Sequence, residues 1–247
     1  MPALQLAGIR QIIAGVLYVG FFIYRKAPWP KGKEWIPIIV LSFLNFILSN
    51  GLSTWGVQYI SAGLGSIMGA IFPLWLVVIG LFTAKSKLPR NALIGLLLGF
   101  GGVCVIFFPD FRFGIILSLI ATWTWAFASL YTKQQANKFN PYFGLGLQMV
   151  IAGITLVITT EATGLSIPIA SIPWKAWAAI GYLVLFGSVI TFIAYLYALQ
   201  NLPTEQASIY AYINPIVAVL CGWLFFGEVV STFIIIGGLV ALLGVFM

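Results

Sequence analysis

The chain has 247 residues, of which 62% are hydrophobic and only 7% are charged. A soluble domain carries roughly 25% charged residues and 45–50% apolar ones, and a disordered chain has low hydrophobicity, so both classes are excluded. A β-barrel is excluded as well, because barrel strands alternate apolar and polar residues whereas these runs are apolar throughout. The composition therefore predicts an all-α, polytopic membrane helical bundle.

The chain contains no histidine and only five carboxylates, which removes most routes to acid–base, triad or metal chemistry. We expect no enzyme activity, no metal and no cofactor. The formal charge of +7 could point to nucleic acid, but the basic residues lie in short gaps between apolar runs. That pattern fixes orientation in a membrane. The expected partners are the lipid bilayer and a small-molecule substrate, with no nucleic acid, and a homodimer is left open.

Nine apolar segments are candidates for membrane spans, because a span needs about 20 predominantly apolar residues. The ninth is short. In chain order the segments cover residues 6–24, 36–59, 62–84, 91–108, 114–131, 142–160, 176–199, 207–226 and 232–247.

Basic residues predict the orientation of these spans. Nine of them lie in the loops after the first, third and fifth spans, whereas the opposite loops contain only Arg112 and Lys175. Cytoplasmic loops carry the excess of Lys and Arg. We therefore expect the N-terminus outside and the C-terminus inside, in the multi-pass arrangement of a plasma membrane protein of the bacterial inner membrane.

The sequence repeats itself at a shift of 142 residues, which aligns Pro73 with Pro215 and Gly80 with Gly222. The first and sixth spans align at a shift of 138. The fifth span has no partner, so we expect a five-helix unit whose first copy lacks its first helix. The expected domains are 1–108, with four helices, and 113–247, with five. An odd number of helices inverts one unit relative to the other, as in secondary transporters. A duplicated membrane scaffold is the plainer alternative.

Polar residues inside spans face the bundle interior or a cavity, because lipid exposure is costly. Arg10 is the only basic residue within a span, and its repeat partner is Gln148. Arg10 either binds an anionic or carboxylate group, or it snorkels or pairs with backbone carbonyls. Asn45 and Asn50 either line a cavity or bond to a neighbouring helix. Since they are five positions apart, they do not share one face of an α-helix.

The eighth span carries a second group of candidates. Tyr210 and Asn214 are four residues apart and share a helix face, next to Pro215, which frees a backbone carbonyl. They line a cavity or belong to a structural kink. Glu205 is the candidate for coupling transport to protons, although a negative charge is favoured at a helix start in any case.

Two aromatic residues complete the set of candidates. Trp125 lies about two turns inside its span, deeper than an interfacial belt position, and is a cavity candidate. Tyr197 adds aromatic surface in the seventh span, where an interfacial belt is the alternative explanation.

Several runs resemble the EamA family of the drug/metabolite transporter superfamily, among them LAGIRQIIAG, GLGSIMGAIFPLWLVVIG and EQASIYAYINPIVAVLCGWLFFGE. The resemblance covers nearly the whole chain. It implies ten helices in two inverted five-helix repeats, and export of metabolites, amino acids among them. The sequence departs from the family in lacking the first helix and in having Lys85-Ser86 where members often have Gly-Glu.

These observations together predict a secondary transporter, an exporter by its resemblance, of small organic metabolites such as amino acids. It would work by alternating access around a midplane cavity lined by aromatic and amide side chains. A channel or a non-transporting membrane scaffold is the alternative.

Overall fold

A computed structural model of the chain describes residues 1–84, 90–107, 113–135, 139–202, 207, 210–227 and 231–246. Within these ranges the secondary structure is helical and includes no strand, which confirms the expected all-α class. The elements are α1 (Ala3–Tyr24), η1 (Gly32–Glu34), α2 (Trp35–Leu41), η2 (Ser42–Gly51), α3 (Leu52–Gly56), α4 (Ala62–Gly69), α5 (Phe72–Ala84), α6 (Arg90–Phe107), α7 (Phe113–Gln135), α8 (Pro141–Ala162), η3 (Ile169–Ser171), α9 (Trp174–Tyr182), η4 (Leu183–Ile190), α10 (Thr191–Asn201), α12 (Tyr210–Phe226) and α13 (Thr232–Phe246).

Helices long and apolar enough to cross a membrane make up most of the described chain. Six segments meet both requirements, and two shorter apolar helices follow toward the C-terminus. Together with α6, these segments fall on the nine spans expected from the sequence. The protein is a polytopic membrane helical bundle.

Proline acts differently at the two repeat-equivalent positions, Pro73 and Pro215. A proline lacks the backbone N–H, and its ring clashes with the carbonyl of the residue four positions earlier. In the third span the helix is interrupted: α4 ends at Gly69, and α5 begins at Phe72 after a short turn. Pro215 instead lies inside a continuous α12. A proline break is therefore found at only one of the two positions.

Two long helices widen into π-helix near their centres. η2 lies between α2 and α3, and η4 lies between α9 and α10. A π-helix closes each hydrogen bond over five residues instead of four, and such segments are frequent at functional sites. Moved along by 142 residues, positions 42–51 become 184–193, which overlap η4 at Leu183–Ile190. The same distortion thus occurs at equivalent places in the two halves of the sequence.

The chain divides into two compact units. Unit 1 comprises Met1–Thr54 and Ala128–Pro203, and unit 2 comprises Trp55–Phe127 and Thr204–Met247. Each unit therefore takes helices from both halves of the sequence, and the boundaries between units fall within α3 and α7. This division crosses that of the sequence repeats, whose boundaries stay a prediction.

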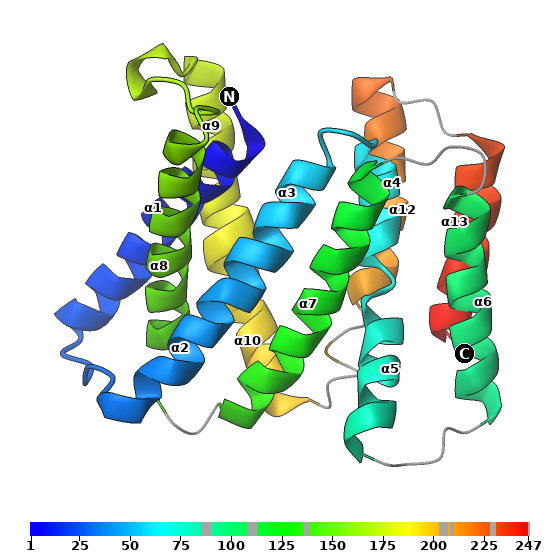
Figure 1. The fold of residues 1–247 in the computed structure, drawn as a ribbon, viewed down its shortest axis with the longest axis horizontal. Coiled ribbons are helices and arrows are strands. Elements are labelled where there is room, and N and C mark those ends of the chain that lie inside the picture. Colours follow the sequence, from blue (N-terminus) through cyan, green and yellow to red (C-terminus); the bar gives the residue numbers. More distant parts are fainter. Residues whose placement is uncertain are drawn as a thin grey trace. The chain divides into compact units, whose positions relative to one another are not determined.

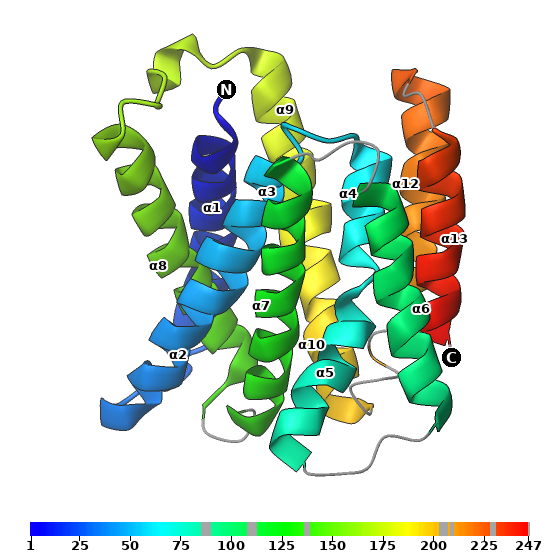
Figure 2. The ribbon, with the colours of Figure 1, turned by 45° about the vertical axis from the view of Figure 1, so that its right-hand side comes forward.

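In unit 1, α1 and α8 lie side by side with their backbones in close contact (Figures 1 and 2). A Cβ added to Gly8 would lie 3.0 Å from the Gly153 carbonyl oxygen, and one added to Gly15 would lie 2.8 Å from the Gly146 carbonyl oxygen. Residue numbers rise along α1 as they fall along α8, so the helices are antiparallel. The sequence alignment predicts that these two helices are repeat equivalents, and an inverted repeat requires such helices to run in opposite directions.

In unit 2, α6 and α13 pair in a similar way and run in opposite directions (Figure 1). A Cβ on Gly102 would lie 2.5 Å from the Ala241 amide nitrogen and equally close to the Gly237 carbonyl oxygen. α4 packs against α12 and contributes Met68 to a buried apolar cluster. Glycine thus allows close helix contact in both units, as is common in membrane helix pairs.

The ends of α8 are defined by its own sequence. The side chain of Asn140 accepts hydrogen bonds from the backbone N–H groups of Tyr142 and Phe143, each at 3.1 Å, and Pro141 occupies the first turn. Both features favour a helix start. After the last turn, Gly164 has φ +66°, the left-handed conformation in which glycine commonly ends a helix.

We expect Gly15→Ala to destabilise the protein and Gly20→Ala, on the same helix, to leave it as stable or slightly more so. A Cβ at position 15 would lie 2.7 Å from the Val150 amide nitrogen, whereas nothing lies within 4 Å at position 20. Overpacking costs about 1–3 kcal/mol, and alanine favours a helix over glycine by up to about 1 kcal/mol. Thermal unfolding in detergent measures both variants, and equal midpoints would contradict a tight crossing of α1 and α8.

Candidate functional site

The asparagines of the second span lie on η2. In an α-helix, positions five apart differ by about 140° around the axis, which is why the sequence predicts different faces for Asn45 and Asn50. The wider turn of a π-helix brings such positions closer to one face. Asn50 bonds to α1 and Asn45 bonds to α8, two helices that pack against each other. The two asparagines thus contact two different helices of unit 1.

Arg10 of α1 is held by an amide. Its Nη2 donates a hydrogen bond to Oδ1 of Asn50, whose backbone carbonyl accepts from Thr54 Oγ1 at 2.7 Å. The Nε of the same guanidinium is buried and has no hydrogen-bond partner among the described residues. Because an amide oxygen carries no net charge, this contact positions the guanidinium without neutralising it. Arg10 is thus a fixed cation with donor capacity to spare.

The repeat partner of Arg10 joins the same region from α8. Asn45 Nδ2 donates to Gln148 Oε1 at 3.4 Å, at the long end of hydrogen-bond distances, and Ser42 Oγ donates to the backbone carbonyl of Gln148 at 3.0 Å. All three side chains are buried. Four of the residues predicted from the sequence therefore form two hydrogen-bonded pairs, both in unit 1.

Gln11, next to Arg10, is a buried polar residue that the sequence reading missed. Its side chain is fully buried, and neither its amide oxygen nor its amide nitrogen has a hydrogen-bond partner within the described part of the chain. Leaving such a group unpaired costs about 1–3 kcal/mol, so it calls for an explanation. The side chain of Gln5, by contrast, is paired through both its nitrogen and its oxygen. It donates to the Ile167 carbonyl at 2.7 Å and accepts from the Ile167 N–H at 3.2 Å. Gln11 keeps its donor and its acceptor available.

The spacing of the glycines on either side of Gln11 is a sequence signal that its side chain is buried. Gly8, Gln11 and Gly15 are spaced by three and four residues, so they share one face of α1. That face packs against α8, as the glycine contacts show. Gln11 lies between two glycines that contact the backbone of α8, so its side chain is held inside the bundle.

Ser188 is a further residue that the sequence reading did not single out. It lies fully buried in η4, and its Oγ has no partner among the residues that the structure describes. Nearby, Tyr18 Oη donates to the backbone carbonyl of Val189 at 2.9 Å. The π-helical segment of the seventh span is thereby tied to α1, which contacts it.

The structure describes the side chains of three of the remaining predicted residues. Tyr197 on α10 is 65% exposed. In unit 2, Trp125 is half-buried on α7 and Asn214 is exposed on α12. Tyr210 begins α12, but its side chain lies outside the described residues, as does the whole of Glu205.

The group in unit 1 is defined here as the polar cluster: Arg10, Gln11, Asn45, Asn50 and Gln148. It contains the partly buried guanidinium of Arg10, bonded to Asn50, and the fully buried amide of Gln11, which has no partner among the described residues. Guanidinium donors match carboxylate oxygens in geometry and charge. The polar cluster thus holds one guanidinium and several amides inside a membrane helix bundle.

We expect Asn50→Leu to destabilise the protein by about 1–3 kcal/mol, because it removes the acceptor of a partly buried cation. The double variant Arg10→Met/Asn50→Leu should be more stable than Asn50→Leu alone, since no unpaired charge remains. Asn45→Leu, which removes a bond between two neutral amides, should cost less than Asn50→Leu. Chemical unfolding in detergent measures these three variants and Arg10→Met alone, which completes the double-mutant cycle. Additive effects of the Arg10 and Asn50 substitutions would contradict the pairing.

Comparison with known proteins agrees with this architecture. A solved crystal structure of another protein superposes with a TM-score of 0.68 over 99% of this chain and 86% of the other, at 15% sequence identity, a likeness that shows the fold alone. An uncharacterized inner membrane transporter of Escherichia coli strain K12, YedA, is 30% identical over 237 residues, which cover 93% of this chain and 76% of YedA. An uncharacterized transporter of Bacillus subtilis, YoaV, is 24% identical over 255 residues, covering 100% of this chain and 87% of YoaV.

The relatives extend to plants and agree with a family assignment. A chloroplastic WAT1-related protein of Arabidopsis thaliana is 24% identical over 255 residues, covering 98% of this chain and 61% of its own length. The model of the EamA-like transporter family matches residues 1–108 and 112–247. The resemblance seen in the sequence is thereby confirmed, and it points to transport rather than enzymatic catalysis. The chain belongs to the EamA-like transporter family.

Proposed function

We propose that this protein is a secondary transporter in the plasma membrane that exports small organic metabolites with a carboxylate, amino acids among them, by alternating access. One observation carries the substrate class: the partly buried guanidinium of Arg10 is positioned by a neutral amide, and the next residue, Gln11, has a buried amide with no partner among the described residues. A carboxylate would take the spare guanidinium donors, and the Gln11 amide would meet a second polar group of the solute. The direction of export rests on the family resemblance.

Counterflow in proteoliposomes separates this proposal from the alternatives. Vesicles loaded with an unlabelled amino acid are diluted into buffer that contains a trace of the labelled one. We expect transient, saturable accumulation of label, which requires a carrier. Flux that rises without saturation would indicate a channel, and absence of flux across a panel of metabolites would indicate a scaffold, so either result would overturn the proposal.

The role of Arg10 is tested with paired substrates. We expect Arg10→Gln to raise KM for a transported amino acid by about 10- to 150-fold, the effect of losing a charged hydrogen bond of about 1.5–3 kcal/mol. The methyl ester of the same amino acid lacks the carboxylate, so the wild type should transport it poorly and the variant should lose the discrimination. Glutamine can still bond to Asn50, which keeps the structural contact in place.

Lys175→Gln is the matched control for this experiment. It removes one positive charge from an exposed residue in the same unit and should leave both KM values unchanged. If Arg10→Gln lowered transport of the acid and the ester equally, Arg10 would be a structural residue, and the carboxylate preference would need another explanation.

Coupling to protons is a separate proposal that rests on Glu205. We expect Glu205→Gln to abolish acceleration of transport by an imposed pH gradient, while exchange at equal pH on both sides continues. A neutral glutamine cannot carry a proton but has nearly the shape of glutamate. Transport that responds to the gradient equally in both proteins would assign the mechanism to uniport or exchange.

A further inference from the structure

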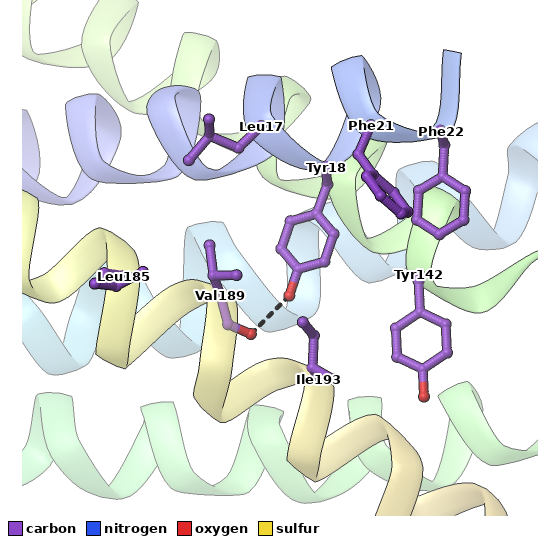
Figure 3. A pocket seen from close by; sticks show the side chains of 8 residues that line it. All are labelled: Leu17, Tyr18, Phe21, Phe22, Tyr142, Leu185, Val189 and Ile193. Carbon is purple, nitrogen blue, oxygen red and sulfur yellow. Dashed lines mark hydrogen bonds between the residues drawn. The ribbon is translucent and has the colours of Figure 1, made fainter. Parts of the chain in front are cut away.

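An apolar groove of about 470 Å³ opens on unit 1, away from the residues of the polar cluster. One wall is α1, with Leu17 and Phe21, and the other is the seventh span, with Leu185 and Ile193 (Figure 3). Tyr142, at the start of α8, lies at the end of the groove where Phe22 also lies (Figure 3). The groove is thus built by three helices that belong to one unit.

The groove offers almost nothing to a polar solute. Tyr18 reaches across it, but its hydroxyl group donates to the Val189 carbonyl at 2.9 Å, which uses the polar atom and fixes the ring (Figure 3). Leu17, Phe21 and Leu185 are half-exposed or more, so the groove is open along its length rather than enclosed. An occupant must therefore be apolar and must enter from the side, as a hydrocarbon chain in a bilayer does.

Positive charge gathers just beyond one end of the groove. Arg25 and Lys26 follow the last lining residue of α1 by about one turn, and both are exposed. Lys31 and Lys33 come next and are also exposed. The one carboxylate in this stretch, Glu34, accepts a hydrogen bond from the Lys31 backbone N–H at 2.7 Å. Four cations against one carboxylate favour an anionic group at this end of the groove.

We propose that this groove binds one acyl chain of an anionic phospholipid, with the lipid phosphate at Arg25 and Lys26. The apolar walls account for the chain, and the cations one turn beyond account for the headgroup. Tyr142 has an apolar ring and a polar hydroxyl, which suits the boundary between the two. This lipid site is separate from the polar cluster and does not depend on which solute is transported.

The test compares two lipids with identical oleoyl chains, phosphatidylglycerol and phosphatidylcholine. The full chain is purified in detergent and delipidated, each lipid is titrated in, and native mass spectrometry counts the retained molecules. We expect one lipid retained with clear preference for phosphatidylglycerol, and a raised unfolding midpoint, because a ligand of the folded state stabilises it.

Two kinds of variant separate the chain site from the headgroup site. Ile193→Trp and Leu185→Trp fill the groove from its two ends and should abolish retention of both lipids, whereas Ile158→Trp, on an exposed part of α8 outside the groove, should not. Arg25→Gln/Lys26→Gln should weaken phosphatidylglycerol binding by about 25-fold, from roughly fivefold per charge, and leave phosphatidylcholine unchanged. Lys175→Gln is the control for charge.

The outcomes are distinct for each part of the proposal. Lipid retained by both tryptophan variants, with unfolding as cooperative as in the wild type, would show that the groove is not the site. An unchanged preference for phosphatidylglycerol in Arg25→Gln/Lys26→Gln would show that these cations do not hold the phosphate. Either result would overturn the proposal, whatever the transport assays give.

Discussion

The close approach of α1 and α8 is the contact on which the rest of unit 1 depends. Within lipid no hydrophobic effect drives two helices together, so close packing and polar contacts must do so. Gly8 and Gly15 on one helix meet Gly153 and Gly146 on the other, and a Cβ added to any of the four would lie 2.8–3.3 Å from a carbonyl oxygen of the facing helix. This places Gln11 inside the bundle and brings α1 against both π-helical segments, while α8 contacts η2.

The same packing decides how the interior polar groups are satisfied. Arg10 donates a hydrogen bond to Asn50, Asn45 donates one to Gln148, and the Tyr18 hydroxyl donates one to a backbone carbonyl in the seventh span. Gln11 finds no partner among the described residues. In a scaffold such an unpaired group is only a cost, because its hydrogen bonds are not made. In a transporter the same hydrogen bonds are useful, because they remain available to a solute or to water.

The sequence predicted the helical class and the positions of the long helices, because apolar runs and proline and glycine punctuation are local signals. It also singled out Arg10 and Asn50, since polar residues in a span are few. It did not predict that these two pair, because they are 40 positions apart and a contact between two helices is not a local signal. Gln11 was missed for a related reason: its burial follows from the glycine crossing and not from its own type.

Because η2 is π-helical, its contacts hold the second span at one rotation about the helix axis. If η2 closed into an ordinary α-helix, the residues after it would turn about the axis by one residue's angle, about 100°. Asn45, near the start of the segment, would turn little, while Asn50, near its end, would swing away from the guanidinium of Arg10. The Arg10–Asn50 hydrogen bond therefore links the helix type of η2 to whether the Arg10 guanidinium is bonded to Asn50. Loss of the Arg10–Asn50 hydrogen bond would remove one restraint on the rotation of the second span.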